Sequence, residues 1–109
     1  MLNDYYMIPT KVMKGTFEID VEVRRLTSNE KILYIELVRY GMENAAYCMK
    51  GEDKRLHCTV GQGTIGKELE FTRVTVRRNL KSLVQAKLIE IPPVKDCKIQ
   101  TIYINTDID

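Results

Sequence analysis

Apolar and charged residues alternate without a break from Thr16 to Arg24. The odd-numbered positions place four apolar side chains on one face of an extended chain, namely Phe17, Ile19, Val21 and Val23. The pattern predicts one half-buried strand with an acidic outer face, whose edge can pair with a second subunit. Pro9 interrupts the apolar run at 5–13, which favours an edge strand or an extended arm, followed by a turn at Lys14-Gly15.

Helical spacing follows between Leu26 and about Gly41. Thr27 and Glu30 have the spacing of a capping box, in which each side chain satisfies a free backbone N–H of the other residue. The apolar surface of this helix is wide and comprises Leu33, Tyr34, Ile35, Leu37, Val38 and Tyr40. We therefore expect the helix either to be sandwiched within the domain or to contribute to a dimer. Residues 42–55 predict a loop or short helix end with a reversal, and Leu56–Val60 a small strand.

Two more helices are predicted between Thr59 and Lys87. Thr59 and Gln62 repeat the capping-box spacing before a helix that reaches Leu69. Thr72 can cap a third helix, from Arg73 to about Lys87.

The junction between these two helices is expected at Glu70-Phe71, although periodicity alone would also allow one unbroken helix. Gly63 and Gly66 each cost about 1 kcal/mol relative to Ala in a helix, so close packing around them is expected. The buried face of the third helix is expected to hold Val76, Leu80 and Leu83. The opposite face holds Val74, Arg78, Lys81 and Gln85, with Thr75 and Arg77 beside it.

A hairpin is predicted at the end of the pattern. Leu88–Ile91 forms its first strand, residues 92–96 its turn, and Ile99–Asn105 its alternating second strand. Lys95 and Lys98 stand near the tip.

Length and composition predict one compact domain. Of the 109 residues, 44% are hydrophobic and 29% are charged, and we expect a single domain over 1–109 with an N-terminal extended or strand region (1–25), a helical core (26–91) and a C-terminal hairpin (88–105). A chain of this size covers its core only marginally, so a partner subunit is expected. Neither an apolar run of bilayer length nor a secretory pattern is present in the sequence, which predicts a cytoplasmic protein without a membrane partner.

The positive charge is concentrated in one part of the sequence. Eleven Lys or Arg residues face six acids between Lys50 and Lys98, whereas the remaining sequence is net acidic. Between Phe71 and Lys87 there is no acid, and the cations are Arg73, Arg77, Arg78, Lys81 and Lys87. Such a one-sided distribution is typical of a protein that binds a polyanion.

A glycine motif offers a competing interpretation. Gly61–Gly66 satisfies G-x-G-x-x-G after a possible strand, and Glu90 lies about where the ribose-binding acid of a dinucleotide fold would be. However, no strand-helix-strand unit precedes Leu56 and eighteen residues follow Ile91, so a doubly wound sheet cannot be completed. Dinucleotide binding is therefore disfavoured.

Metal chemistry and catalysis are also disfavoured. The three cysteines, Cys48, Cys58 and Cys97, contain no CxxC pair. His57 and Cys58 are adjacent in a predicted strand and would point to opposite faces, so they would not serve one tetrahedral ion. One histidine and no carboxylate pair beside a nucleophile leave no catalytic constellation, and we expect neither a cofactor nor an enzyme.

The central stretch resembles the helix-turn-helix of winged-helix DNA-binding proteins. Ile65–Leu69 resembles the second helix of that family, with Gly66 at its usual small residue, and Thr72–Arg78 resembles the start of the recognition helix. The leucines at the end of that family's recognition helix and the start of its wing correspond to Leu80, Leu83 and Leu88-Ile89. Glu70 and Lys87 depart from the pattern, since glycine is common at both positions.

Residues 26–40, LTSNEKILYIELVRY, are similar to the first helix of plasmid replication initiator N-terminal domains and related phage proteins. In size the chain is more similar to small proteins that bind the origin of transfer of conjugative plasmids. The resemblance implies an α+β winged helix-turn-helix, with a three-helix core, a C-terminal β-hairpin wing and an N-terminal strand or hairpin.

The function that this resemblance implies is sequence-specific binding of double-stranded DNA from a plasmid or other mobile element. The chain would act at an origin of conjugative transfer or replication, or at a promoter, as a homodimer and beside other DNA-processing proteins. Winged helices also serve as protein–protein interaction modules, which is the alternative.

Duplex geometry assigns candidate roles. A helix fits the major groove, where Arg bonds guanine and a Val or Thr methyl meets a thymine methyl, so the candidate base readers are Arg73, Val74, Thr75, Arg77 and Arg78. The candidate phosphate contacts are Lys81, Lys95, Lys98 and the amides at the start of the second helix.

Overall fold

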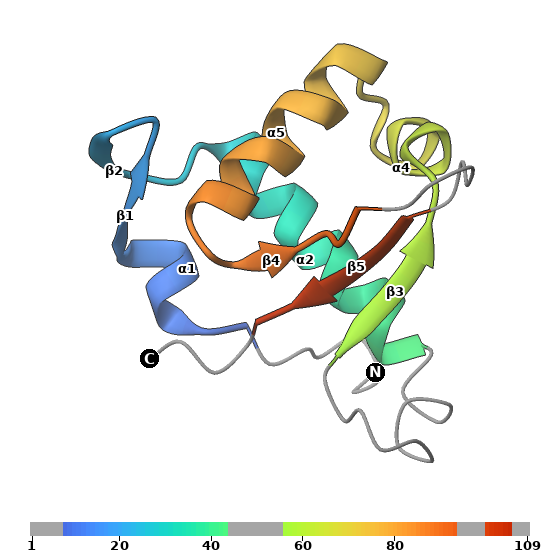
Figure 1. Cartoon of the computed structure of the whole chain (residues 1–109), viewed down its shortest axis with the longest axis horizontal. Helices are drawn as coiled ribbons and strands as arrows, with labels where there is room; N and C mark the ends of the chain where they lie inside the picture. The colour runs from blue at the N-terminus through green and yellow to red at the C-terminus, as the bar shows by residue number, and fades with distance from the viewer. Residues whose placement is uncertain (1–7, 44–55, 94–99, 106–109) are drawn as a thin grey trace.

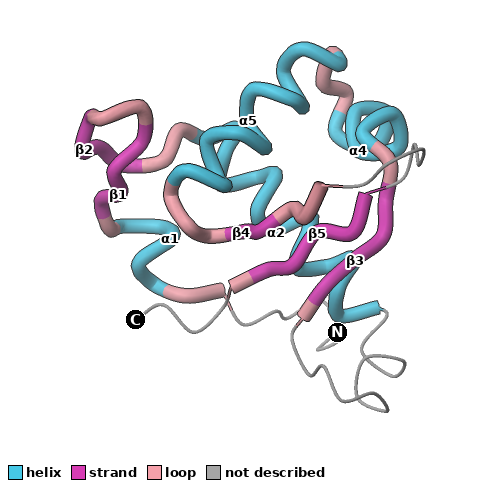
Figure 2. The backbone as a smooth tube through the Cα atoms, in the orientation of Figure 1, coloured by secondary structure: helices cyan, strands magenta, loops and turns pink. Residues whose placement is uncertain are grey.

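The computed structural model describes residues 8–43, 56–93 and 100–105 (Figure 1). Their elements are α1 Thr10–Lys14, β1 Thr16–Ile19, β2 Glu22–Arg25, α2 Ser28–Glu43, β3 His57–Val60, α4 Gln62–Leu69, α5 Arg73–Gln85, β4 Ile89–Glu90 and β5 Gln100–Ile104. The strands form an antiparallel β1–β2 hairpin and an antiparallel sheet of order β3-β5-β4 (Figure 2). Two helices joined by a short turn and followed by a strand pair confirm the predicted α+β, winged-helix type of fold.

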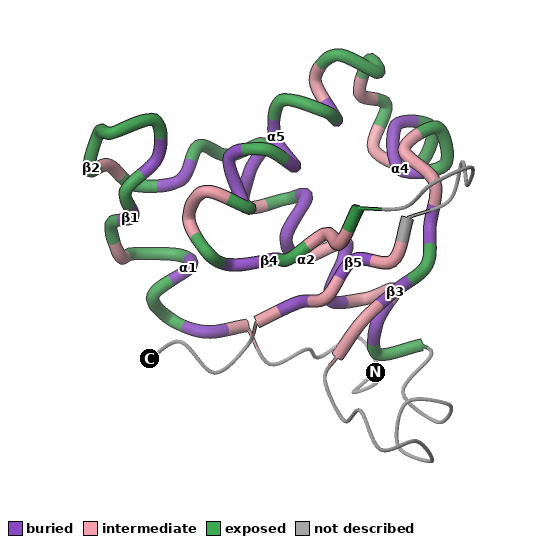
Figure 3. Tube along the Cα trace, viewed as in Figure 1, coloured by how far each residue is buried: buried purple, intermediate pink, exposed green. Residues whose placement is uncertain are grey.

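The core lies between α2, α5 and the three-stranded sheet (Figure 3). From α2 it receives four side chains that are at most 1% exposed, namely Leu33, Tyr34, Leu37 and Val38. The Tyr34 hydroxyl donates a hydrogen bond to the Asn105 carbonyl at 2.7 Å, which ties the helix to the chain just after β5. The apolar surface of α2 is therefore buried within the domain. This is the first of the two predicted alternatives, a helix sandwiched within the domain rather than one exposed for a dimer.

The predicted capping box at the start of α2 is confirmed. The Glu30 amide donates to Thr27 Oγ1 at 3.2 Å, and the Thr27 amide donates to Glu30 Oε1 at 2.8 Å. Two backbone donors that the helix cannot satisfy by itself are thus satisfied, and α2 runs two residues beyond the predicted end at Gly41.

The single strand predicted from Thr16 to Arg24 was wrong, because the chain reverses in its middle. Asp20 and Val21 have φ angles of 54° and 57°, and they form a two-residue turn between β1 and β2. Positive φ at both central residues matches the twist of a tight hairpin. The register pairs Val23 with Glu18, so the apolar side chain lies on the outer face and is 69% exposed. Alternation of period two continues through such a turn and cannot reveal it.

The edge strand or extended arm predicted at residues 5–13 was also wrong over the part that is described. Residues Thr10–Lys14 form the short helix α1, with Pro9 at its N-cap. A proline is tolerated there because an N–H at the start of a helix has no intrahelical acceptor. Val12 is fully buried and anchors α1 on the core.

Helix α4 ends at Leu69 as predicted, but it begins at Gln62 rather than directly after a cap at Thr59. Thr59 lies within β3, and the N-cap is Gly61, which makes no side-chain hydrogen bond. The close packing expected around Gly66 is present, since a Cβ there would lie 2.8 Å from the Phe71 carbonyl oxygen. Gly63 has no such neighbour within 4 Å, so its cost in the helix is not offset by packing.

Two non-glycine residues adopt left-handed backbone where the winged-helix pattern favours glycine. Glu70 ends α4 with φ 58° and ψ 38°, and Lys87 follows α5 with φ 63°. The Phe71 amide then bonds the Gly66 carbonyl at 2.9 Å, and the Leu88 amide bonds the Leu83 carbonyl at 3.0 Å. Both helix ends are thus closed by backbone bonds, and the glycine departures leave the turn geometry intact.

The C-terminal strands pair as a hairpin, as predicted. Ile89 faces Ile104, and Glu90 faces Tyr103, while β3 adds to the other edge of β5. Ile102 and Ile104 point into the core, at 0% and 3% exposure. Residues 94–96 of the predicted turn and the two lysines, Lys95 and Lys98, lie outside the described residues. The loop predicted at 42–55 was wrong at its start, because Met42 and Glu43 belong to α2, and its remaining residues, 44–55, lie outside the described ranges.

Candidate nucleic-acid interface

Helix α5 has both buried and exposed residues along its length (Figure 3), and its exposed side carries the charge. The predicted apolar side is confirmed, since Val76, Leu80 and Leu83 are at most 3% exposed. Its outer side carries Arg73, Arg77, Arg78 and Lys81, all exposed, which we name the cationic face. Val74 lies among these cations and is 60% exposed.

The charge of the cationic face is not balanced within the described part of the chain. The salt bridges among the described residues join Arg24 and Arg39 to acids of β2 and α2. None of them involves a residue of α5. The first turn of α5 also lacks an acid, although the helix dipole makes this end favourable for negative charge. An arginine at the positive end of a helix opposes folding, so the charge is better explained by an anionic ligand.

A threonine pair fixes the start of α5. The Thr75 amide donates to Thr72 Oγ1 at 3.1 Å, which confirms the predicted N-cap. The Thr72 hydroxyl in turn donates to Thr75 Oγ1 at 2.9 Å, and the Thr75 side chain is half-buried. Among the predicted base readers, Thr75 thus has part of its hydrogen-bonding capacity used within the helix.

The start of α4 has backbone donors that no side chain caps. Gly61 offers no side chain to cap them, and the first turn contains no acid. Gly63 and Thr64 are exposed there. The close Gly66–Phe71 contact holds α4 against the turn into α5.

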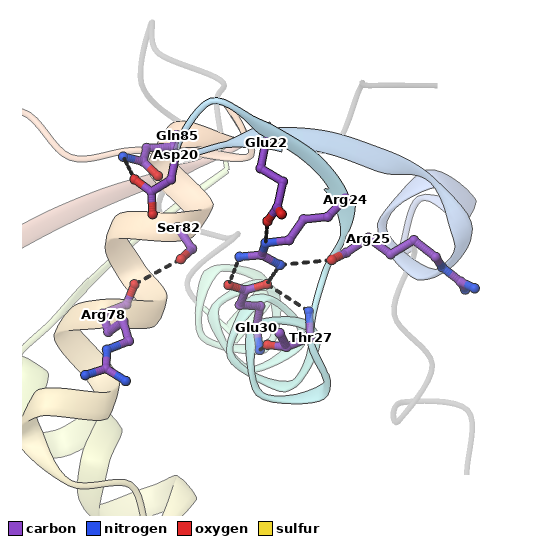
Figure 4. Close-up of polar contacts among 9 residues, drawn as sticks. All are labelled: Asp20, Glu22, Arg24, Arg25, Thr27, Glu30, Arg78, Ser82 and Gln85. Atoms are coloured by element: carbon purple, nitrogen blue, oxygen red, sulfur yellow. Dashed lines mark hydrogen bonds and ion pairs between the residues drawn. The ribbon is translucent and has the colours of Figure 1, made fainter.

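A polar cluster that the sequence did not reveal fastens the β1–β2 hairpin to α2 and α5 (Figure 4). Arg24 binds both carboxylate oxygens of Glu30, at 3.0 and 2.9 Å, and the Glu30 side chain is 4% exposed. At the hairpin turn, Gln85 of α5 donates to Asp20 at 3.0 Å. These contacts position the C-terminal half of α5, away from its cationic first turns.

The pKa of Glu30 reflects this cluster. Burial by itself raises the pKa of the carboxyl, but hydrogen bonds from Arg24 and from the Thr27 amide, together with the positive charge of Arg24, outweigh burial and lower it to about 2. Glu30 is therefore charged at neutral pH and is neutralised by Arg24, whereas the cations of α5 have no acidic partner among the described residues.

The competing sites find no support in the described residues. Every strand pair is antiparallel, whereas a dinucleotide fold needs a parallel sheet beside the glycine motif. Cys58 is buried, which raises the pKa of its thiol to about 12, and His57 packs on Tyr103 with 5.6 Å between ring centroids. No group of three potential metal ligands occurs in the described ranges, which exclude Cys48 and Cys97.

Comparison with known proteins gives one structural likeness. No family model matches the chain, and no curated protein matches it. A solved structure described as "N-Terminal domain of DNA binding protein" is similar in fold, with a TM-score of 0.65 and 21% identity over 96% of this chain and 76% of that one. At this identity the likeness supports the fold. Among the described helices, none has the length and apolar character needed to cross a bilayer.

Proposed function

We propose that this chain binds double-stranded DNA through the cationic face of α5. The observation that carries the proposal is the clustering of four exposed cations on the second helix of a helix-turn-helix, without an acid on that helix. A helix of this kind fits the major groove, where arginine can bond guanine O6 and N7. The similar solved structure is described as part of a DNA-binding protein, which agrees with this proposal.

The proposed roles divide the surface into base and phosphate contacts. The base readers are Arg73, Val74, Arg77 and Arg78. Thr75 stabilises the start of the helix and is also a candidate for a base contact. Lys81 and the α4 amides hold phosphates and so set the position of α5 on the duplex. Lys95 and Lys98 of the wing are proposed to contact the backbone beside the major groove.

The biological setting that we propose is a plasmid or other mobile element, with the chain acting at an origin of transfer or replication, or at a promoter. Specific binding to such a site is tested by selecting bound sequences from a random duplex pool. Competition then compares the selected duplex with a scrambled duplex of the same composition. A preference of about a thousandfold or more is expected for specific recognition.

Equal competition by the scrambled duplex would contradict specific recognition. If no duplex binds at all, while an acidic protein is bound through the same cations, the chain is an interaction module instead. Arg77→Ala is tested for binding to the duplex and to the acidic protein. The function is assigned by which of the two ligands loses affinity.

We also propose that the chain acts as a homodimer, paired through the β1–β2 hairpin. Val21 and Val23 are 94% and 69% exposed, and β2 is an edge of its two-stranded sheet. Pairing of two copies of β2 would cover Val23 and complete the edge. Light scattering should report a dimer for the natural chain and a monomer for Val23→Lys, and a monomer for both would contradict the pairing.

A further inference from the structure

The most exposed apolar side chain on α5 is surrounded by its cations. Val74 is 60% exposed at the second position of the helix, whereas Val76, two residues later, is fully buried. Arg77 and Arg78 are one turn further along the same side of the helix, so the isopropyl group of Val74 lies within the cationic face.

Folding gives no reason for valine at this position. A β-branched side chain loses rotamer freedom in a helix, and an exposed one recovers little of that loss through burial. Alanine or a long polar residue would favour the helix more. The valine is explained if a ligand removes it from water, and that ligand must combine negative charge with an apolar group.

A pyrimidine C5 methyl group in duplex DNA meets both requirements. It projects into the major groove beside the base edges that arginine reads, and it is the one apolar group on that edge. A-form RNA fits less well, because its major groove is too deep and narrow for side chains to read and uracil lacks the methyl group.

We infer that Val74 reads the C5 methyl group of a pyrimidine next to the bases contacted by the arginines of α5. The inference rests on the proposed DNA binding and specifies which chemical group of the bases Val74 contacts. It also makes the preferred ligand a B-form DNA duplex. Two sources share the chemistry, since thymine and 5-methylcytosine carry the methyl group at the same place in the groove.

The test uses the full chain and the duplex selected from a random pool. One series of duplexes replaces each thymine in turn by uracil (as deoxyuridine), and a second replaces each cytosine in turn by 5-methylcytosine. Burial of one methyl group contributes about 0.8 kcal/mol, so removing the methyl that is read should weaken binding about fourfold. The same replacement should not change the affinity of the Val74→Ala variant. This variant should fold normally, because the side chain that it shortens is exposed.

Val84→Ala is the matched control. It removes the same groups from a valine that is 40% exposed on the same helix, ten residues and about 15 Å further along the axis. This variant should retain the fourfold response to deoxyuracil. Circular dichroism of both variants checks that α5 is intact.

Each outcome decides the inference. A fourfold loss with deoxyuracil, abolished by Val74→Ala, assigns the methyl to thymine, and a fourfold gain with 5-methylcytosine, likewise abolished, assigns it to methylated cytosine. Specific binding that ignores both replacements overturns the role of Val74 and leaves the proposed function standing, as does a response that persists in Val74→Ala. Absence of any specific duplex binding overturns the proposed function itself.

Discussion

The two longest helices of the protein begin with the same local device in opposite surroundings. At the start of α2, Thr27 Oγ1 accepts the amide of Glu30 at 3.2 Å, and at the start of α5, Thr72 Oγ1 accepts the amide of Thr75 at 3.1 Å. The first site is closed by a buried carboxylate and Arg24, whereas the second has no acid and is followed by exposed arginines.

The difference separates a structural helix start from one available to a ligand. In α2, the charge that favours the positive end of the helix dipole comes from Glu30, so the site is complete within the fold. In α5, the same end carries more positive charge and no compensation among the described residues. The electrostatic cost of α5 in the free protein becomes an attraction when a polyanion binds.

The largest effect on stability is expected from Glu30→Ala. It removes the capping carboxylate and leaves Arg24 without its bidentate partner, which should lower the free energy of unfolding by about 3 kcal/mol. Urea unfolding measures the change. Glu43→Ala is the control on the same helix, because it breaks an exposed pair with Arg39 and should cost less than about 0.5 kcal/mol.

Acid should weaken the same cluster. The pKa of Glu30 is lowered to about 2 in the folded protein, below its ordinary value of 4.5. The resulting stability is present above pH 4.5 and is lost as the pH falls toward 2, by up to about 3 kcal/mol. The difference in unfolding free energy between the natural chain and Glu30→Ala should therefore shrink between pH 5 and pH 2. A constant difference across this range would contradict the charged Arg24–Glu30 pair.

On the α5 side, the largest expected effect is on DNA binding. Arg77→Ala combined with Arg78→Ala should weaken binding of the selected duplex at least about a hundredfold, because each arginine contributes a charge-assisted contact. Fluorescence anisotropy measures the affinity. Lys14→Ala with Lys31→Ala removes the same charge from residues of α1 and α2 and should leave affinity nearly unchanged. Equal losses in the two double variants would reduce the role of α5 to net charge.

The two caps provide the smallest and most closely matched comparison. Thr27→Ala and Thr72→Ala should each lower the free energy of unfolding by about 1 kcal/mol, since each removes a side-chain acceptor from an N-terminal amide. Only Thr72→Ala should also weaken DNA binding, by a few-fold, because it loosens the turn that presents Arg73 and Val74. Calorimetry and anisotropy on both variants check the contrast.

The features that the sequence predicted correctly depend on few residues. The Thr27–Glu30 box, the Thr72 cap and the buried face of α5 each follow from spacing within one or two turns of helix. The same spacing at Thr59 and Gln62 misled, because Thr59 belongs to a strand and Gly61 intervenes as the cap. A capping pattern alone therefore does not fix where a helix starts.

The features that could not be predicted depend on the tertiary structure. The turn at Asp20-Val21 interrupts no alternation, yet it brings Arg24 onto Glu30 and Asp20 onto Gln85. The exposed face of α5 followed from helical periodicity. The sequence did not show that this face has no acidic partner among the described residues. The acids of α2 and β2 that form salt bridges there pair with Arg24 and Arg39 instead.

The salt dependence of duplex binding tests most directly whether the cationic face of α5 contacts DNA. The logarithm of affinity should fall linearly with the logarithm of salt concentration, with a slope of about −0.9 for each phosphate contact. Lys81→Ala should make the slope shallower by about 0.9, whereas Lys14→Ala, on α1, should leave it unchanged. Identical slopes for the natural chain and both variants, or binding indifferent to salt, would contradict the account.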